Sequence, residues 1–168
     1  MGEGSGQFSF AVITMSDKGA RGEREDTSGA ALQQLLSAEG YILQAYVIIP
    51  DDREKIISTV LDCIDNRKID LIVTTGGTGV APTDVTPEAM QPVIEKEIPG
   101  MAEAMRAASL LKTPNAVLSR SRAGIRGKSL IINLPGSKKA ALENIQVLLP
   151  SLAHALDKIQ GGNSDCGG

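Results

Sequence analysis

Hydrophobic positions along the chain follow two periods in turn. Short apolar runs, typical of buried strands, alternate with longer segments in which apolar residues recur every three or four positions, as on one face of a helix. The runs predict strands at residues 8–15, 42–49, 71–75 and 129–133, and a brief strand at 117–118. The periodic segments predict helices at 27–39, 51–66, from 86, from about 101, and up to about 159. This alternation predicts an α/β fold: a mostly parallel sheet covered by helices on both faces.

Local sequence features mark where the predicted helices begin. Asp26 or Thr27 is placed to cap the first of them. Asp51, with Glu54 three residues later, has the spacing of a capping box, so Asp51 is expected to cap the next helix. Thr86-Pro87 fits an N-cap followed by proline at the first helical position. Between residues 16 and 26 the pattern predicts a polar loop.

Length and composition indicate one domain. The 168 residues are enough for a core of useful size, and 42% of them are hydrophobic, nearly all aliphatic. Neither repeats nor linkers interrupt the pattern. We expect a single domain over residues 8–160, with frayed tails at 1–7 and 161–168.

Charge and cysteine content narrow the class of protein. The net charge of −3 argues against nucleic-acid binding, which draws on a basic surface. No apolar run is long enough to span a bilayer, and the first seven residues lack the features of a secretory signal. Cys63 falls in a helical pattern as a core residue and Cys166 in a small polar tail, so no disulfide is expected. We predict a cytoplasmic protein.

A glycine-rich loop follows the predicted strand at 71–75. It reads Thr75-Gly76-Gly77-Thr78-Gly79, and three glycines in four positions let backbone N–H groups converge on an anion such as phosphate. Asp84-Val85-Thr86-Pro87-Glu88-Ala89 comes soon after. A carboxylate beside a phosphate repels it unless a cation intervenes, so Asp84 suggests Mg²⁺. The loop is not a Walker A motif, because no Gly-Lys-Ser/Thr follows.

Three further polar segments follow predicted strands, and each has two interpretations. Asp51 either caps the next helix or joins Asp84 on a metal. The long loop bearing Ser16-Asp17 and Asp26-Thr27-Ser28-Gly29 is either a solvated loop with a cap or part of the site. Asn133-Leu134-Pro135-Gly136-Ser137 either presents amides to a ligand or turns the chain into the last helix. Ligands of such folds bind at the carboxyl ends of the strands.

Two other features add less. Arg120, Arg122, Arg126 and Lys128 form a basic stretch, which is either a solvated surface or an attractor for a ligand with several phosphates. His154, the single histidine, lies in the last predicted helix without a nucleophile motif beside it, so it is expected to be structural or at the surface. Neither a Ser-His-Asp mechanism nor a zinc site has support.

Taken together, these motifs resemble those of the MogA family of molybdenum cofactor biosynthesis, which includes the gephyrin G domain. The resemblance covers about residues 9–160. It rests on the glycine loop with Asp84 to Ala89, on Ile49-Pro50-Asp51, and on the stretch that begins at Ser119-Arg120-Ser121 and ends at Gly136. That combination is highly specific.

The resemblance implies a three-layer α/β/α sandwich and a molybdopterin adenylyltransferase, commonly a trimer. Such an enzyme joins the terminal phosphate of molybdopterin to the α-phosphorus of ATP and releases pyrophosphate, with Mg²⁺. The two essential aspartates of the family match Asp51 and Asp84. The expected contacts to substrate and nucleotide are Ser16, Asp17, Thr75, Gly76, Gly77, Thr78, Gly79, Thr86, Glu88, Ser119, Ser121, Asn133, Pro135, Gly136 and Ser137. Hand-over of the product to a molybdate insertase is also expected.

Other interpretations remain open. The related MoaB proteins share the fold, and Asp26-Thr27-Ser28-Gly29 resembles MoaB as much as MogA. The main alternative is therefore a MoaB-like protein that binds pterin or nucleotide without catalysis. Asp51 after Ile-Pro, and Val-Thr-Pro after Asp84, favour the enzyme. A scaffold of the gephyrin kind, a molybdate insertase and a CinA-like nucleotide hydrolase fit less well.

Overall fold

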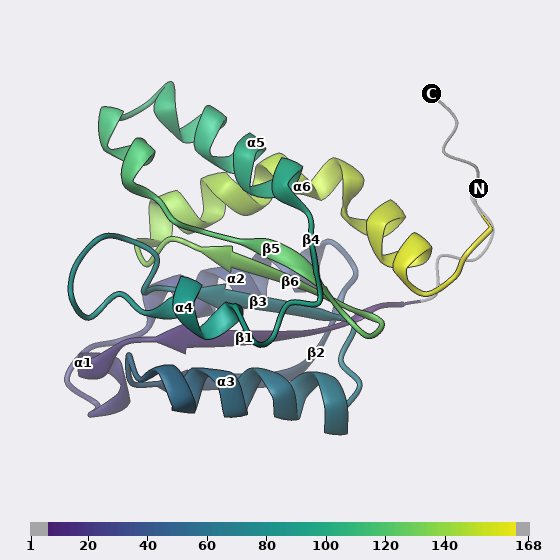
Figure 1. The fold of residues 1–168 in the computed structure, drawn as a ribbon, viewed down its shortest axis with the longest axis horizontal. Helices are drawn as coiled ribbons and strands as arrows, with labels where there is room; N and C mark the ends of the chain where they lie inside the picture. Colours follow the sequence, from purple (N-terminus) through teal and green to yellow (C-terminus); the bar gives the residue numbers. More distant parts are fainter. Residues whose placement is uncertain (1–6, 164–168) are drawn as a thin grey trace.

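A six-stranded sheet forms the centre of the molecule (Figure 1). The computed structural model describes residues 7–163, so most of the two predicted tails lies outside the described residues, as does Cys166. Across the sheet the strands follow the order β2 (Ile42–Ile49), β1 (Ser9–Met15), β3 (Leu71–Thr75), β6 (Ser129–Leu134), β5 (Ala123–Arg126) and β4 (Lys96–Glu97). The first four are parallel, whereas β5 runs antiparallel to β6 and β4 antiparallel to β5.

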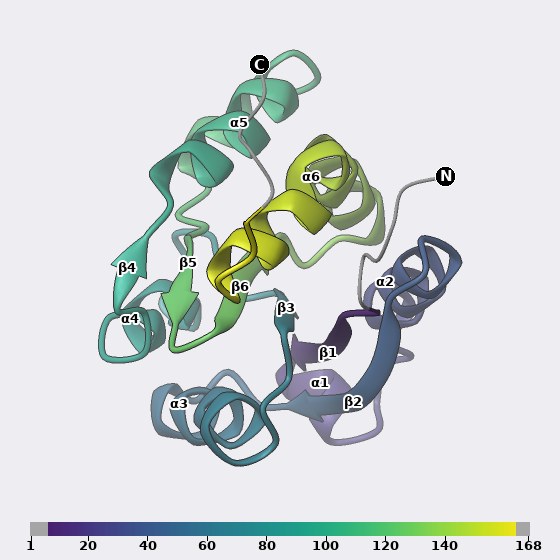
Figure 2. The ribbon, with the colours of Figure 1, turned by 90° about the vertical axis from the view of Figure 1, so that its right-hand side faces the viewer.

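Helices cover both faces of the sheet, and Figure 2 shows the three layers nearly edge-on. One face carries α2 (Thr27–Ala38), α5 (Pro99–Leu110) and α6 (Lys138–Ile159); the other carries α3 (Arg53–Leu61), η1 (Asp62–Asn66) and α4 (Thr86–Met90). Side chains of a strand alternate between the faces. Phe10 and Val12 therefore pack under α2 and α6, while Ala11 and Ile13 pack under α3. The predicted α/β sandwich is confirmed.

The four long strands match their predicted ranges closely, but the antiparallel edge of the sheet was not predicted. β5 and β4 are too short to show a period of two. The predicted strand at 117–118 is wrong: these residues end η2 (Pro114–Leu118), a 3₁₀ helix. Pro114 occupies its start, and the Thr113 hydroxyl accepts a hydrogen bond from the Asn115 N–H at 3.3 Å.

Helix starts show which aspartates have structural roles. Asp26 caps α2, as predicted, by accepting a hydrogen bond from Gly29 N at 2.8 Å. The cap of α3 is Asp52 rather than Asp51, because Asp52 Oδ1 accepts from Lys55 N at 2.8 Å. The prediction that Asp51 is the cap is therefore wrong.

Two other local predictions also need correction. Thr86 was expected to cap a helix, but it is the first residue of α4, and Val85 takes the cap position without a side-chain hydrogen bond. The predicted loop at 16–26 contains a short helix, α1 (Asp17–Ala20), which Ser16 caps by accepting from Gly19 N at 3.0 Å.

Residues outside the site agree with their predicted roles. Cys63 is buried in the core beneath α3, and His154 is exposed on α6. None of the helices between residues 7 and 163 combines the length and the hydropathy that crossing a bilayer requires.

Candidate active site at the carboxyl ends of the strands

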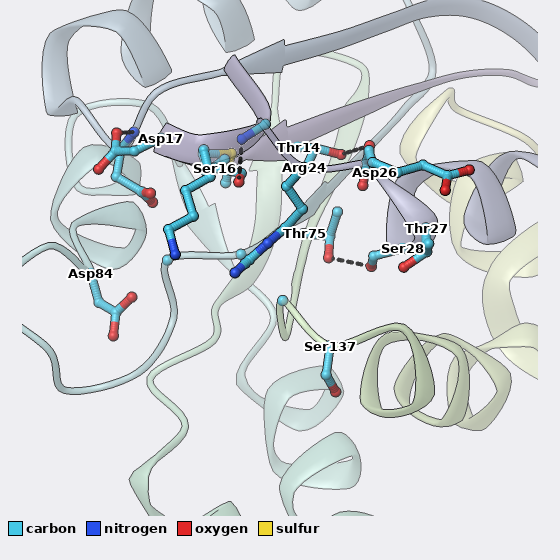
Figure 3. A pocket seen from close by; sticks show the side chains of 18 residues that line it. Thr14, Ser16, Asp17, Arg24, Asp26, Thr27, Ser28, Thr75, Asp84 and Ser137 are labelled. Atoms are coloured by element: carbon cyan, nitrogen blue, oxygen red, sulfur yellow. Dashed lines mark hydrogen bonds between the residues drawn. The ribbon is translucent and has the colours of Figure 1, made fainter. Parts of the chain in front are cut away.

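A cavity of about 520 Å³ lies where the parallel strands end (Figure 3). All four loops that leave β1, β2, β3 and β6 contribute to its lining. The structure thus brings together, from distant parts of the sequence, the predicted residues Ser16, Asp17, Asp51, Thr75, Gly76, Gly77, Asp84, Gly136 and Ser137. Placement at this edge of the sheet is the one expected for ligand sites of parallel α/β folds.

The glycine loop requires glycine at two of its positions. Gly76 and Gly77 have φ angles of +105° and +69°, which residues with a Cβ rarely adopt. A Cβ at Gly76 would also collide with the Met15 carbonyl oxygen, and one at Gly77 with Thr86 Oγ1. The Cβ at Gly77 would also lie 3.2 Å from Asp51 Oδ1. The backbone of the loop therefore packs directly against the end of β1 at Met15 and against Asp51.

Buried hydroxyl groups hold this loop in place. Thr86 Oγ1 donates to the Gly76 carbonyl oxygen at 3.0 Å, and Thr75 Oγ1 donates to that of Pro135 at 2.7 Å. Ser28 Oγ lies 2.8 Å from Thr75 Oγ1. Since all three side chains are nearly inaccessible to solvent, their hydrogen bonds fix the loop relative to β6 and α2.

Carboxylates crowd one side of the cavity. Asp17 Oδ1 accepts a hydrogen bond from the Asp51 N–H at 2.9 Å, and Asp84 Oδ2 accepts from Ala81 N at 2.9 Å. Partial burial raises the pKa of the Asp51 carboxyl above its usual value, and the charges of Asp17 and Asp84 raise it further, while a backbone hydrogen bond at Asp17 offsets part of the rise. A cation among these carboxylates would relieve that repulsion.

The donor set fits a magnesium ion that arrives with a substrate. Within residues 7–163 no three His, Cys, Asp or Glu side chains converge into a site that could hold a metal alone. Asp51 and Asp84 offer oxygen ligands only. Mg²⁺ is commonly held by one or two carboxylates together with substrate phosphates and water. Asp51 and Asp84, which line a cavity large enough for several phosphate groups, meet that requirement.

Arg120 fastens the segment between Gly79 and Asp84. Its Nε donates to the Gly79 carbonyl oxygen at 2.8 Å and one terminal nitrogen donates to that of Asp84 at 2.9 Å, while the other pairs with Glu88. The Arg120 backbone N–H also donates to the Thr78 carbonyl oxygen at 2.8 Å. One side chain thus holds both ends of the segment that positions the Asp84 carboxylate.

The two other arginines of the basic stretch are also paired within the protein, whereas Lys128 is exposed. Arg122 pairs with Glu97 and Arg126 with Asp65. The three arginines therefore neither form a free solvated surface nor point as a group toward a ligand. Neither of the two interpretations drawn from the sequence describes these arginines. Arg120 holds the segment that carries Asp84, Arg122 joins β4 to α4, and Arg126 joins β5 to η1.

A second cavity, of about 360 Å³, adjoins the first. Gly136 and Ser137 line both, so the turn after β6 forms a shared wall. The predicted residues that line only the second cavity are Thr78, Gly79, Ser119 and Pro135. The second cavity is the less polar of the two, because Ala116, Leu118 and Ala140 contribute to it.

Four predicted contact residues line neither cavity. Thr86 and Glu88 hold the glycine loop and Arg120, as described above. Asn133 is fully buried and donates to Thr74 Oγ1 at 2.9 Å. Ser121 is nearly buried, and its hydroxyl accepts a hydrogen bond from Ser119 Oγ at 3.2 Å. The structure gives these side chains supporting positions behind the cavity walls.

Sequence reasoning missed several residues that line the cavities. Lys18 and Arg24 line the first cavity, and Arg106, Ser109 and Asn144 line the second. The first two stand between the predicted segments Ser16-Asp17 and Asp26 to Gly29, so their position in the loop was the available signal. The other three lie on helices, where nothing in the local pattern marks them.

Comparisons with known proteins identify the family of this chain. The family model described as "Probable molybdopterin binding domain" matches residues 11–154. A curated relative from Helicobacter pylori, "Molybdopterin adenylyltransferase", is 44% identical over 90% of this chain and 88% of its own. A longer relative from Chlorobaculum tepidum, "Molybdenum cofactor biosynthesis bifunctional protein", is 36% identical, and the match covers 90% of this chain but 48% of that protein.

Solved structures of similar proteins share the whole fold. The molybdopterin biosynthesis enzyme MoaB from Thermus thermophilus superposes with a TM-score of 0.87 at 46% identity, covering 92% of this chain and 98% of that one. A MogA structure gives 0.86 at 36% identity, with 90% and 99% covered. The chain therefore belongs to the molybdopterin-binding family that includes the MogA and MoaB proteins.

Proposed function

We propose that this protein is a molybdopterin adenylyltransferase, which transfers AMP from ATP to the terminal phosphate of molybdopterin and releases pyrophosphate. The observation that carries the proposal is the meeting of Asp51, Asp84 and the Gly76-Gly77 backbone in one cavity, beside a second cavity that shares its wall. The name of the Helicobacter pylori relative supports it.

The proposed reaction makes few demands on acid–base groups. A phosphate oxygen of molybdopterin attacks the α-phosphorus of ATP, the bond from that phosphorus to the bridging oxygen breaks, and the electron pair leaves with pyrophosphate. The attacking oxygen is already anionic, so no proton has to be removed. This fits a site in which the single histidine, His154, lines neither cavity. What remains for the protein is alignment and neutralisation of charge.

Asp51 and Asp84 are proposed to hold Mg²⁺ with the phosphates. Bound there, the ion would neutralise charge on the triphosphate and on the departing pyrophosphate. The chain contributes by orienting the two carboxylates: Asp17 fixes the backbone at Asp51, and Arg120 fixes the segment that ends at Asp84. Gly76 and Gly77, which lack a Cβ, let the glycine loop pack directly against Met15, Thr86 and Asp51 at the edge of the cavity.

The two cavities are proposed to divide the substrates between them. Phosphate groups fit the first, where the aspartates and glycines are. An organic ring fits the second, whose lining includes Ala116, Leu118 and Ala140. The shared wall at Gly136-Ser137 then lies near the point where the two substrates are joined.

Two partner proposals accompany the reaction. A homotrimer follows from the family resemblance, and exposed apolar side chains at the end of α5 and in η2 offer a surface for subunit contact. Hand-over of the adenylylated product to a molybdate insertase is supported by the longer bifunctional relative, in which the matched region is about half of the protein.

The alternative is a binding protein that does not turn over. The observation that favours it is the resemblance to MoaB, whose Thermus thermophilus structure is 46% identical to this chain. Such a protein would use the same cavities to hold pterin or nucleotide without forming the new phosphate bond.

Measuring pyrophosphate release distinguishes the adenylyltransferase from the non-catalytic binding protein. With ATP, Mg²⁺ and molybdopterin, we expect release that depends on molybdopterin and that falls by at least about a hundredfold in Asp84→Asn, because a charged ligand of the ion is lost. Asp52→Asn is the matched control: it removes the charge next to Asp51 but keeps a good helix cap, so it should retain activity. Full activity in Asp84→Asn would contradict the metal assignment, and binding without release would establish the alternative.

A further inference from the structure

Four cationic side chains line the two cavities, and only two of them are paired with other groups of the described part of the chain. Arg106 donates to the backbone oxygens of Ser119 and Ser121 at 3.4 and 3.1 Å, and Lys112 pairs with Glu143 at 3.1 Å. Lys18 and Arg24 have neither an ion pair nor a side-chain hydrogen bond to any residue of the described part of the chain. They are the cations of the site left available for a ligand.

Both residues belong to an arm that is anchored at its two ends. The arm runs from β1 to α2. At its start, Asp17 accepts the hydrogen bond from Asp51 N. At its end, Asp26 accepts from Thr14 Oγ1 at 2.6 Å, from Tyr46 Oη at 2.5 Å and from Gly29 N at 2.8 Å. The arm is therefore fixed relative to the sheet at both ends.

Because its carboxylate is used elsewhere, Asp26 does not pair with Arg24. The Asp26 carboxylate already accepts hydrogen bonds from Thr14, Tyr46 and Gly29, and these bonds connect the arm to the sheet and to α2. Figure 3 shows the Arg24 side chain extending across the middle of the cavity, with Asp17 and Asp84 to one side and Ser28 to the other. A ligand phosphate on the aspartate side of Arg24 would lie between a cation and the metal-binding carboxylates.

Charge balance makes such cations useful. The acidic residues that line the cavity are Asp17, Glu25, Asp26, Asp51 and Asp84, and a triphosphate brings several further negative charges that one Mg²⁺ offsets only in part. As the bond at the α-phosphorus breaks, negative charge grows on the two departing phosphates. Preplaced cations at that position stabilise the transition state more than the bound substrate.

We propose that Lys18 and Arg24 bind the two phosphates of ATP that leave as pyrophosphate. The assignment rests on the proposed adenylyl transfer for the identity of the leaving group. It places pyrophosphate in the cavity that contains the aspartates, because the cations of the second cavity are taken by Glu143 and by backbone oxygens.

Binding of magnesium pyrophosphate to the full chain tests this directly by isothermal titration calorimetry. Lys18→Met and Arg24→Met should each weaken binding by about tenfold, the loss of one charge-assisted contact, and the double variant by more. Arg21→Met is the matched control. Arg21 is in the same arm but pairs with Glu23 and lines neither cavity, so its variant should bind as the wild type does. All three positions are exposed, and thermal unfolding should be unchanged.

Turnover provides the second readout and separates this assignment from the proposed function. In the Lys18 and Arg24 variants, kcat should fall and inhibition by added pyrophosphate should weaken together. If the wild type binds pyrophosphate through these residues but does not release it from ATP, the cation assignment holds and adenylyl transfer is rejected. The assignment is overturned if Lys18→Met and Arg24→Met bind as tightly as the wild type, if Arg21→Met is equally weakened, or if the wild type does not bind pyrophosphate.

Discussion

Asp51 and Asp52 are neighbours in the sequence and have different roles in the structure. The Asp52 side chain caps α3 by accepting a hydrogen bond from the Lys55 N–H, which would otherwise lack a partner. Asp51 turns into the cavity, and its pKa is raised by burial and by the nearby carboxylates. Asp52 therefore contributes to stability, whereas folding places the charge of Asp51 in an unfavourable environment.

Substitution should separate these two roles. Asp52→Ala is expected to lower the free energy of unfolding by about 1 kcal/mol, since a helix cap is lost, and to leave turnover nearly intact. Asp51→Asn should abolish most turnover. Because the folded protein raises the pKa of Asp51, its charge at neutral pH opposes folding, so removing that charge should keep or raise the melting temperature. Thermal melts beside pyrophosphate assays check both, and a destabilised, active Asp51→Asn would contradict the assignment.

Gly77 shows how a single missing Cβ shapes the site. Gly77→Ala places a methyl group against Thr86 Oγ1 and near Asp51 in a residue with positive φ. We expect a loss of more than about 2 kcal/mol of stability together with most of the activity. Gly127→Ala is the control: its φ of +55° carries the same backbone strain, but no atom lies within 4 Å of the added Cβ. It should cost about 1 kcal/mol and spare activity, as urea titration and turnover would show.

At the scale of elements, the loop between β3 and α4 is held by a residue from far along the chain. Arg120 bonds to the loop at Gly79 and at Asp84, 41 and 36 residues away, and to Glu88 on α4. Loops with few contacts open readily. The guanidinium gives this loop two contacts, and its third contact, to Glu88, ties the loop to α4, so the segment that carries Asp84 is held in place.

Loss of the contacts made by Arg120 should weaken the proposed magnesium site without unfolding the protein. Arg120→Met is expected to raise the Mg²⁺ concentration needed for half-maximal turnover by about tenfold, while Arg120→Lys restores little, because lysine lacks the planar fork. Arg126→Met removes the pair with Asp65 outside both cavities and serves as the control. An unchanged Mg²⁺ requirement in Arg120→Met would mean that Asp84 is positioned by other contacts.

The same loop shows where sequence reasoning succeeds and where it stops. The strands β1, β3 and β6 are almost fully buried, so each appears in the sequence as a mainly apolar run, and the glycine loop follows β3 directly. The edge strand β2 is largely exposed, but its many apolar residues still mark it as a strand. The pairing of Arg120 with Gly79 depends on how β5 folds back beside β6, and β5 has only four residues and no visible period. Which arginine is paired and which is free is thus a property of the assembled fold.

At the scale of the whole molecule, the surface near the end of α5 is unusually apolar. Leu111 is 90% exposed and Val117 67% exposed, with Leu110 and Leu118 partly exposed beside them in the sequence. Apolar side chains clustered on a surface often mark contact between subunits. The second cavity includes Leu118 in its lining, so a neighbouring subunit at this surface would lie close to that cavity.

Assembly can be tested at this surface. Sedimentation velocity should show a trimer for the wild type and a shift toward monomer for Leu111→Glu, because a charge would be buried at the contact. Leu43→Glu, an exposed apolar position on the edge strand β2, is the control and should sediment as the wild type does. A monomeric wild type at micromolar concentration would reject the trimer.

The shared wall between the cavities has a consequence for the fate of the product. Gly136 approaches Gly76 so closely that a Cβ on it would lie 3.4 Å from the Gly76 Cα, which leaves little protein between the two compartments. In the proposed reaction each substrate would occupy one side, whereas the joined molecule would occupy both at once, and two linked contacts hold far longer than either alone. Departure, rather than bond formation, would then set the pace of the cycle, and a downstream acceptor that draws the product out would quicken it.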